Sequence, residues 1–255
     1  MITQIEHDDI LEVRMTRPPV NALNPELLTQ LREAIEQAPA RGAKGLILSG
    51  GPSVFSAGLD VPYLMTLDRA ALAAAWGTFF AAMAALATAP IPLVAAVGGH
   101  SPAGGAVLAL CCDYRIMVAG DERRAYTIGL NEVQVGLVVP EGVQHLMRRV
   151  VGAYRAERLL VAGAMLEATQ AQRIGLIDEL AEADALLPRA LAWLRDLLAL
   201  PRHAMLTTRR MARADLIDAV SRPERINLDG FLDDWFGSET QTALKATLAR
   251  LKKPG

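Results

Sequence analysis

Two glycine-containing turns are the first features of this sequence that could carry out chemistry. One covers residues 56–60 (Ser-Ala-Gly-Leu-Asp) and the other residues 98–105, and each leads from an apolar stretch toward a helix. The first turn of a helix leaves backbone N–H groups without partners, and glycine lets a ligand approach them closely. If the two turns converge, they could hold one oxygen atom between two N–H donors and stabilise an oxyanion. Either turn alone is more often a packing solution.

Glu132 is the candidate acid/base residue. It lies in an apolar stretch, residues 128–138, and the alternation of side chains points it opposite Val133 and Val135. Glutamate on a strand or turn is usually exposed, and that is the simpler interpretation. If Glu132 faces the core instead, loss of solvation would raise its pKa and make it a stronger base.

The neighbouring pair His100 and Ser101 suggests a serine hydrolase, but the spacing disfavours one. A nucleophile elbow has the pattern Gly-x-Ser-x-Gly, whereas residues 99–104 read Gly-His-Ser-Pro-Ala-Gly, one residue too long. His100 is also badly placed to deprotonate the residue that directly follows it. Hydrolysis by Ser101 is therefore a minor alternative.

The elements that must position these residues follow a βαβ rhythm, which predicts an α/β fold. Strands are expected at residues 10–15, 45–49, 91–97 and 113–118, the second and third being apolar enough for burial on both faces. Asn24-Pro25-Glu26 is typical of a helix start. Further helices are expected at residues 69–87, 106–112, 142–150, 155–162, 169–173, 183–200, 204–220 and 239–252.

Composition excludes several classes of function. With 255 residues, 52% hydrophobic side chains and a net charge of −2, the chain is a globular protein without general attraction for nucleic acid or anionic membranes. The adjacent Cys111 and Cys112 fit no zinc spacing and are expected to be buried thiols in a reducing compartment. The apolar run at residues 81–97 is interrupted by two prolines, and the N-terminus has no basic leader. We expect a cytoplasmic protein.

Several of these motifs resemble the crotonase (enoyl-CoA hydratase/isomerase) superfamily. They are residues 56–60, 102–105 (Pro-Ala-Gly-Gly) and 112–116 (Cys-Asp-Tyr-Arg-Ile). Residues 17–23, 55–60 and 128–136 are similar in particular to the mitochondrial Δ3-Δ2-enoyl-CoA isomerase (dodecenoyl-CoA isomerase) branch. The resemblance extends over nearly the whole chain, and the order and spacing of the motifs both fit.

The resemblance implies roles for individual residues. The oxyanion hole of the superfamily falls on the backbone N–H groups of Leu59 and Gly104, and its catalytic glutamate falls on Glu132. Hydratases carry a second glutamate, which would fall on Val107, and the isomerase branch likewise lacks it. Contacts to the substrate or its coenzyme A are expected from Ala22, Leu23, Ser56, Ala57, Gly58, Asp60, Val107 and Leu130.

The implied reaction converts 3-enoyl-CoA to 2-enoyl-CoA in fatty acid beta-oxidation, with one glutamate acting as base and then as acid. Another crotonase reaction is an alternative, either hydration of 2-enoyl-CoA or isomerisation of a ring-bearing acyl-CoA. A non-catalytic acyl-CoA-binding protein is a third possibility. No metal or redox cofactor is expected, because coenzyme A is part of the substrate.

The resemblance also implies an architecture. A crotonase-like spiral of ββα units with the active site is expected over residues 1–195, followed by a helical trimerisation region over residues 196–255. A homotrimer or a dimer of trimers is expected, with no nucleic acid or membrane partner. The loop at residues 119–124 is longer and more charged than expected for this branch, and the sequence offers no account of it.

Overall fold

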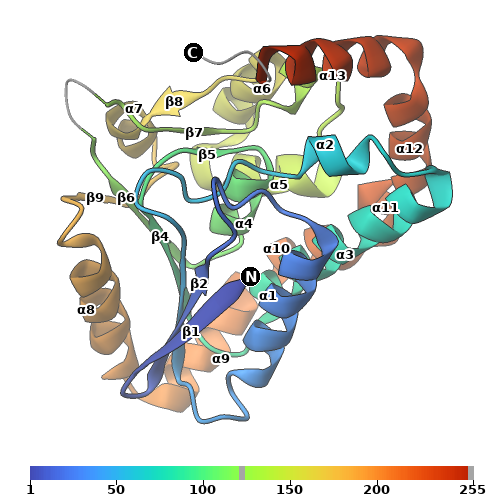
Figure 1. Cartoon of the computed structure of the whole chain (residues 1–255). Coiled ribbons are helices and arrows are strands. Elements are labelled where there is room, and N and C mark those ends of the chain that lie inside the picture. The colour runs from blue at the N-terminus through green and yellow to red at the C-terminus, as the bar shows by residue number, and fades with distance from the viewer. Residues whose placement is uncertain (121–123, 252–255) are drawn as a thin grey trace.

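The computed structural model describes residues 1–120 and 124–251, so part of the charged loop at residues 119–124 lies outside the described residues (Figure 1). Its main sheet has the strand order β1-β2-β3-β4-β6-β9. Strand β1 is antiparallel to β2, and every other neighbouring pair is parallel. The strands are β1 (Ile2–His7), β2 (Ile10–Met15), β3 (Gly45–Ser49), β4 (Leu93–Val97), β6 (Tyr114–Val118) and β9 (Glu179–Ala181).

The central strands are buried on both faces, as their apolar sequences predict. All residues of β3 and β4 are buried. In β3, Leu46 and Leu48 join the large core on one face, whereas Ile47 joins a smaller cluster with Leu194 on the other. This alternation follows from the two-residue period of a strand, and it requires helices on both sides of the sheet.

Helices cover both faces of this sheet. Helices α1 (Pro25–Gln37) and α3 (Arg69–Thr88) lie on one face and α8 (Leu186–Leu198) on the other (Figure 1). The predicted helix start is confirmed, because the Asn24 side chain accepts a 2.9 Å hydrogen bond from the Leu27 N–H. The short α2 (Val61–Leu64) precedes α3.

By its length and composition, helix α3 could cross a membrane. The sequence analysis took residues 81–97 as the candidate segment and did not identify this helix. Of its most apolar window, 56% is buried inside the protein. The helix packs against α1, α10 (Ala214–Ser221) and α12 (Leu228–Phe236). Its apolar surface is therefore used in the core of this fold.

A second, smaller sheet has the order β5-β7-β8 and carries the candidate site. Its strands are β5 (Ser101–Pro102), β7 (Thr127–Gly129) and β8 (Leu166–Glu167). Helix α4 (Gly104–Leu110) begins directly after β5, two residues earlier than predicted. A single 3₁₀ turn, η1 (Glu132–Val135), follows β7. The pairing of β5 with β7 therefore brings the second glycine turn next to the segment with Glu132.

The second half of the chain is mainly helical, as predicted, with two differences. The single helix expected at residues 204–220 is wrong, because the chain breaks at Arg213 between α9 and α10. Helices α11 (Pro223–Ile226) and α12 were not predicted. The division at residue 195 stays a prediction, although it falls inside α8. The remaining helices are α5 (Glu141–Val151), α6 (Ala153–Ala162), α7 (Ala168–Arg173), α9 (Arg202–Ala212), α10 (Ala214–Ser221), α11 (Pro223–Ile226), α12 (Leu228–Phe236) and α13 (Ser238–Leu251).

One buried ion-pair cluster joins the C-terminal helices to the main sheet. The Asp113 carboxylate accepts hydrogen bonds of 2.8–2.9 Å from both Arg209 and Arg213. It also accepts a 2.8 Å bond from the backbone N–H of Leu93, at the start of β4. All three charged side chains are largely buried. Asp113 therefore ties the sheet to the α9–α10 junction.

We expect Asp113→Asn to lower the free energy of unfolding by about 3 kcal/mol or more, because two buried guanidinium groups would lose their counter-charge. Denaturant unfolding at a fixed protein concentration would measure the change. The matched control is Asp9→Asn, which removes an exposed pair with Lys44 and should cost about 1 kcal/mol or less. Equal effects of the two substitutions would show that the cluster adds nothing specific to stability.

Candidate active site

The first glycine turn is held in place by backbone pairing with the segment that follows β2. The Leu23 N–H donates to the Gly58 carbonyl at 2.8 Å, and the Leu23 carbonyl accepts from the Asp60 N–H at 3.0 Å. These two bonds form a parallel bridge between Leu23 and Leu59 that leaves the Leu59 N–H unused. Within residues 1–120 and 124–251, no hydrogen bond is found for the N–H of Leu59 or of Gly104.

Arg17 and Asn21 fasten the same turn, and sequence reasoning did not assign either of them to the site. The Arg17 guanidinium donates to Asp60 Oδ2 at 2.6 Å and to the Ala22 carbonyl at 2.8 Å. The buried Asn21 donates to the Phe55 carbonyl at 3.0 Å. The contacts to Asp60 and Phe55 span 43 and 34 residues, so the resemblance of residues 17–23 marked this segment without showing what its side chains bind. They fix the backbone on either side of Leu59.

The second glycine turn lies directly against the first. A Cβ atom on Gly58 would lie 3.3 Å from the backbone nitrogen of Gly104. Gly58 has a φ of +81°, a conformation that glycine adopts without strain. Ala103 also has a positive φ, +46°, immediately before Gly104 opens α4. The two predicted oxyanion donors therefore come from turns in direct contact, as the convergence hypothesis requires.

The segment that carries Glu132 reaches the same place through β7. The Ala103 N–H donates to the Gly129 carbonyl at 2.8 Å, which joins the second glycine turn to the end of β7. Leu130 follows and is fully buried, and Glu132 begins η1 two residues later. The structure thus brings together the turns at Gly58, Gly104 and Glu132, which are far apart in the sequence.

Glu132 itself is half-buried, but its Oε2 atom is covered and has no hydrogen-bond partner among the described residues. Burial raises the pKa of this carboxyl to about 7, and a hydrogen bond from its own backbone N–H lowers it only in part. The strand-like alternation expected around Glu132 is wrong. Gly136, with a φ of +76°, closes a 3₁₀ turn instead, and Val133 is 38% exposed.

The walls around these groups are apolar. Val107, at the position where hydratases carry their second glutamate, is buried in the first turn of α4. A Cβ atom on Gly104 would lie 3.1 Å from Leu23 Cδ1 and 3.4 Å from Phe79 Cε2, so both side chains pack against this glycine. The other residues with expected substrate contacts lie along the edge of the first turn. Ala57 is exposed, Ala22 and Leu59 are half-buried, and Ser56, Gly58 and Asp60 are buried.

The hydrolase alternative has no support in the geometry. Ser101 is fully buried, and its hydroxyl has no partner among the described residues. His100 Nδ1 lies 3.2 Å from the backbone nitrogen of Thr127 and 3.1 Å from its hydroxyl. The imidazole is therefore engaged with β7 and does not activate Ser101. In residues 1–120 and 124–251, no group of three His, Cys, Asp or Glu side chains suited to a metal ion is found.

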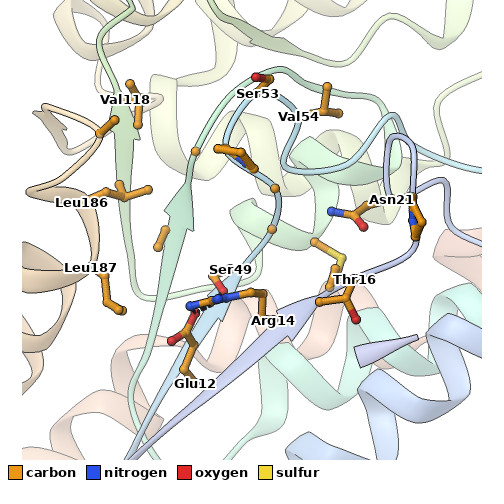
Figure 2. Close-up of a pocket in the computed structure, with 18 of the residues that line it drawn as sticks. Glu12, Arg14, Thr16, Asn21, Ser49, Ser53, Val54, Val118, Leu186 and Leu187 are labelled. Carbon is orange, nitrogen blue, oxygen red and sulfur yellow. Dashed lines mark hydrogen bonds and ion pairs between the residues drawn. The ribbon is translucent and has the colours of Figure 1, made fainter. Parts of the chain in front are cut away.

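A separate cavity of about 680 Å³ lies on the α8 side of the sheet, behind the first glycine turn. Figure 2 shows Glu12, Arg14 and Ser49 together at one end of it and Leu186 at another. Burial would raise the pKa of Glu12, but hydrogen bonds from Arg14, Ser49 and His7 more than offset this and hold it below its usual value. Because the carboxylate is fully engaged, we assign it a structural role.

Comparisons with known proteins agree with this arrangement. Residues 6–242 match the family model described as enoyl-CoA hydratase/isomerase. The chain is 32% identical over 243 residues to mouse "Enoyl-CoA delta isomerase 1, mitochondrial", covering 94% of this chain and 83% of that protein. It is 35% identical over 213 residues to a "Probable enoyl-CoA hydratase" of Mycobacterium avium, covering 83% of this chain and 80% of that protein.

Among solved structures, human mitochondrial delta3-delta2-enoyl-CoA isomerase superimposes with a TM-score of 0.91 at 30% identity. The match covers 98% of each chain. The crotonase fold expected from the sequence is therefore confirmed. By its sequence match over most of its length and by its fold, this chain belongs to the enoyl-CoA hydratase/isomerase family.

Proposed function

We propose that this protein isomerises 3-enoyl-CoA thioesters to 2-enoyl-CoA, within fatty acid beta-oxidation, with Glu132 as the acid/base residue. The observation that carries the proposal is a partly covered carboxyl of raised pKa on the segment after β7, which is hydrogen-bonded to the second of two adjacent turns with unused N–H groups. The similarity to two proteins named as isomerases of this type supports it further.

In the proposed mechanism, the thioester oxygen accepts hydrogen bonds from the N–H groups of Leu59 and Gly104. These bonds acidify the protons on C2 of the 3-enoyl chain, because they stabilise the negative charge that moves onto that oxygen. Glu132 removes one C2 proton, and the C3–C4 double bond becomes part of a dienolate. The protonated Glu132 then delivers its proton to C4, which leaves a double bond between C2 and C3. No atom is gained or lost.

A single carboxylate suits this reaction because it must first accept and then donate one proton. A base works best when its pKa is close to the working pH, and burial brings that of Glu132 to about 7. The apolar side chains of Val107, Leu130 and Leu137 keep water away from the intermediate. No metal or redox cofactor takes part in these steps.

Hydration is the second candidate, because one relative is named as a probable enoyl-CoA hydratase. Addition of water to a 2-enoyl thioester would need a group that orients the water. Val107 is buried and apolar at the position where the hydratase pattern has its second glutamate. We therefore expect hydration to be slower than isomerisation. The trimeric assembly and cytoplasmic location expected from the sequence stay predictions.

Glu132→Gln should lower kcat/KM for a 3-enoyl-CoA ester by about 10³-fold, because the amide cannot accept the C2 proton. In the wild-type protein kcat/KM should rise with pH and level off above about 7, as the carboxylate loses its proton. Ultraviolet absorbance of the conjugated product measures both quantities. Full activity of the variant would refute the proposed base, and faster hydration than isomerisation would favour the alternative. Tight CoA binding without any turnover would favour a binding protein.

The oxyanion hole is tested with two glycines of positive φ, Gly58 (+81°) and Gly42 (+96°). Alanine at either position strains the backbone, but only at Gly58 does the methyl group approach the Gly104 nitrogen; nothing lies within 4 Å at Gly42. Gly58→Ala should lower kcat/KM by about 10²-fold through loss of the oxygen site. Gly42→Ala should destabilise the fold similarly and leave kcat/KM within about twofold. Equal kinetic effects would contradict the assignment.

The raised pKa of Glu132 also predicts how stability depends on pH. The folded state binds this proton more tightly than the unfolded chain, whose carboxyl has the usual value of 4.5, so stability is lost as the pH rises from 4.5 to about 7. Glu132→Gln removes this loss. Its unfolding free energy relative to wild type should increase by about 2 kcal/mol between pH 5 and pH 8. A difference independent of pH in denaturant unfolding would show that Glu132 titrates normally.

A further inference from the structure

Among the described residues, few hydrogen bonds hold the Glu132 carboxylate in position. Its Oε2 has no partner among the described residues, and its own backbone N–H supplies the hydrogen bond that acts on its pKa. The direction of the side chain is therefore set by the backbone of η1. This turn spans only Glu132–Val135, and a single 3₁₀ turn has poor hydrogen-bond geometry and is weakly stable alone.

Two contacts from outside the turn hold it. The Gln134 side chain donates to the Gly163 carbonyl, at the end of α6, at 2.8 Å. The Thr240 hydroxyl donates to the Gly136 carbonyl at 2.6 Å, across 104 residues of sequence. Thr240 lies in the first turn of α13 and is only 5% exposed.

The contact between Gly136 and α13 is close enough to fix the end of the turn. A Cβ atom on Gly136 would lie 3.1 Å from the Cα of Thr240 and 3.2 Å from the Cβ of Ala243. Gly136 closes η1 with its N–H donating to the Glu132 and Val133 carbonyls. The hydroxyl of Thr240 therefore binds the residue on which the geometry of the whole turn depends.

A comparison with the neighbouring Thr242 shows that a threonine in this helix need not bond to another element. Its hydroxyl donates at 2.7 Å to the Ser238 carbonyl, four residues earlier in the same helix, and it is exposed. A threonine in a helix commonly bonds in this way. Thr240 donates instead to a different element, and its bond joins α13 to η1.

We propose that Thr240 is a positioning residue for Glu132. Its hydroxyl holds the catalytic turn η1 through the Gly136 carbonyl, so that proton transfer depends on the packing of α13 against η1. This inference rests on the proposed function of Glu132, but it also has a consequence independent of turnover. A turn released from α13 would let water reach the carboxylate, and its pKa would then fall toward the usual value.

The experiment compares Thr240→Val, Thr240→Ser and Thr242→Val in the full-length protein. Thr240→Val keeps the shape of the side chain but removes the donor, and should lower kcat for a 3-enoyl-CoA ester by about 10-fold to 100-fold. KM should change by less than about threefold, because Thr240 is not among the residues with expected substrate contacts. Thr240→Ser should restore most of kcat, and Thr242→Val should match wild type. If the valine variant fails to fold, Thr240→Ala gives the same comparison with serine.

The second measurement is a titration of Glu132 by ¹³C NMR of the side-chain carboxyl, assigned by its loss in Glu132→Gln. Thr240→Val should lower the midpoint relative to wild type, and Thr242→Val should not. Unchanged kcat and midpoint in Thr240→Val, or a serine variant as impaired as the valine variant, would overturn the proposal. If the wild-type protein does not isomerise any 3-enoyl-CoA, the proposed function fails, while the titration still decides whether Thr240 controls Glu132.

Discussion

The structure around the candidate site depends on keeping one carboxylate away from water without giving it a cation. Loss of solvation is the largest influence on the pKa of Glu132, and among the described residues only a hydrogen bond from its own backbone opposes it. An arginine or lysine nearby would have stabilised the ionised form and made the carboxylate a weaker base. The fold therefore accepts an Oε2 atom with no partner in the described part of the chain, an arrangement that reduces stability and that other parts of the molecule must offset.

Several charged residues support the site indirectly, by holding the surrounding backbone and helices in place. Arg17 pairs with Asp60 and also donates to the Ala22 carbonyl, so it ties the residue after Leu59 to the segment that follows β2. Arg209 and Arg213 pair with Asp113 and hold the C-terminal helices against the sheet. At the candidate oxygen site the expected hydrogen-bond donors are the backbone N–H groups of Leu59 and Gly104. Because such donors are fixed in direction by the fold, they need little rearrangement when charge develops on a ligand.

Local patterns in the sequence predicted the parts of the fold that local forces determine. The buried strands β3 and β4, the cap at Asn24 and most helices were predicted to within a few residues. The conformation at Glu132 was not predicted, because Gly136 closes a turn where the side-chain pattern resembles a strand. The break at Arg213 was also missed; the side chain of this residue pairs with Asp113, 100 residues away, a contact that no local pattern indicates.

For the candidate site, the residues alone predicted two glycine turns and left open whether Glu132 is exposed or faces the core. The resemblance to a family supplied the roles of Leu59, Gly104 and Glu132. The structure adds that the turns touch and that the carboxylate is covered. The resemblance included residues 17–23 but gave Arg17 and Asn21 no role. The side chains that hold these groups in place were not identified from the residues, since most of their contacts cross 29 to 104 residues of sequence.

The C-terminal region, expected from the sequence to serve contacts between subunits, also supports the site of its own chain. In α12, Phe231 packs on Trp76 of α3 with ring centroids 4.3 Å apart, and Thr240 of α13 binds the Gly136 carbonyl at the end of η1 (Figure 1). Terminal helices are often the first elements to open in local unfolding. Each such opening would release Gly136, so the fraction of molecules in which η1 holds Glu132 in this position depends on how stably α13 packs. Any contact that stabilises the tail, within the chain or between subunits, would thereby also stabilise the position of Glu132.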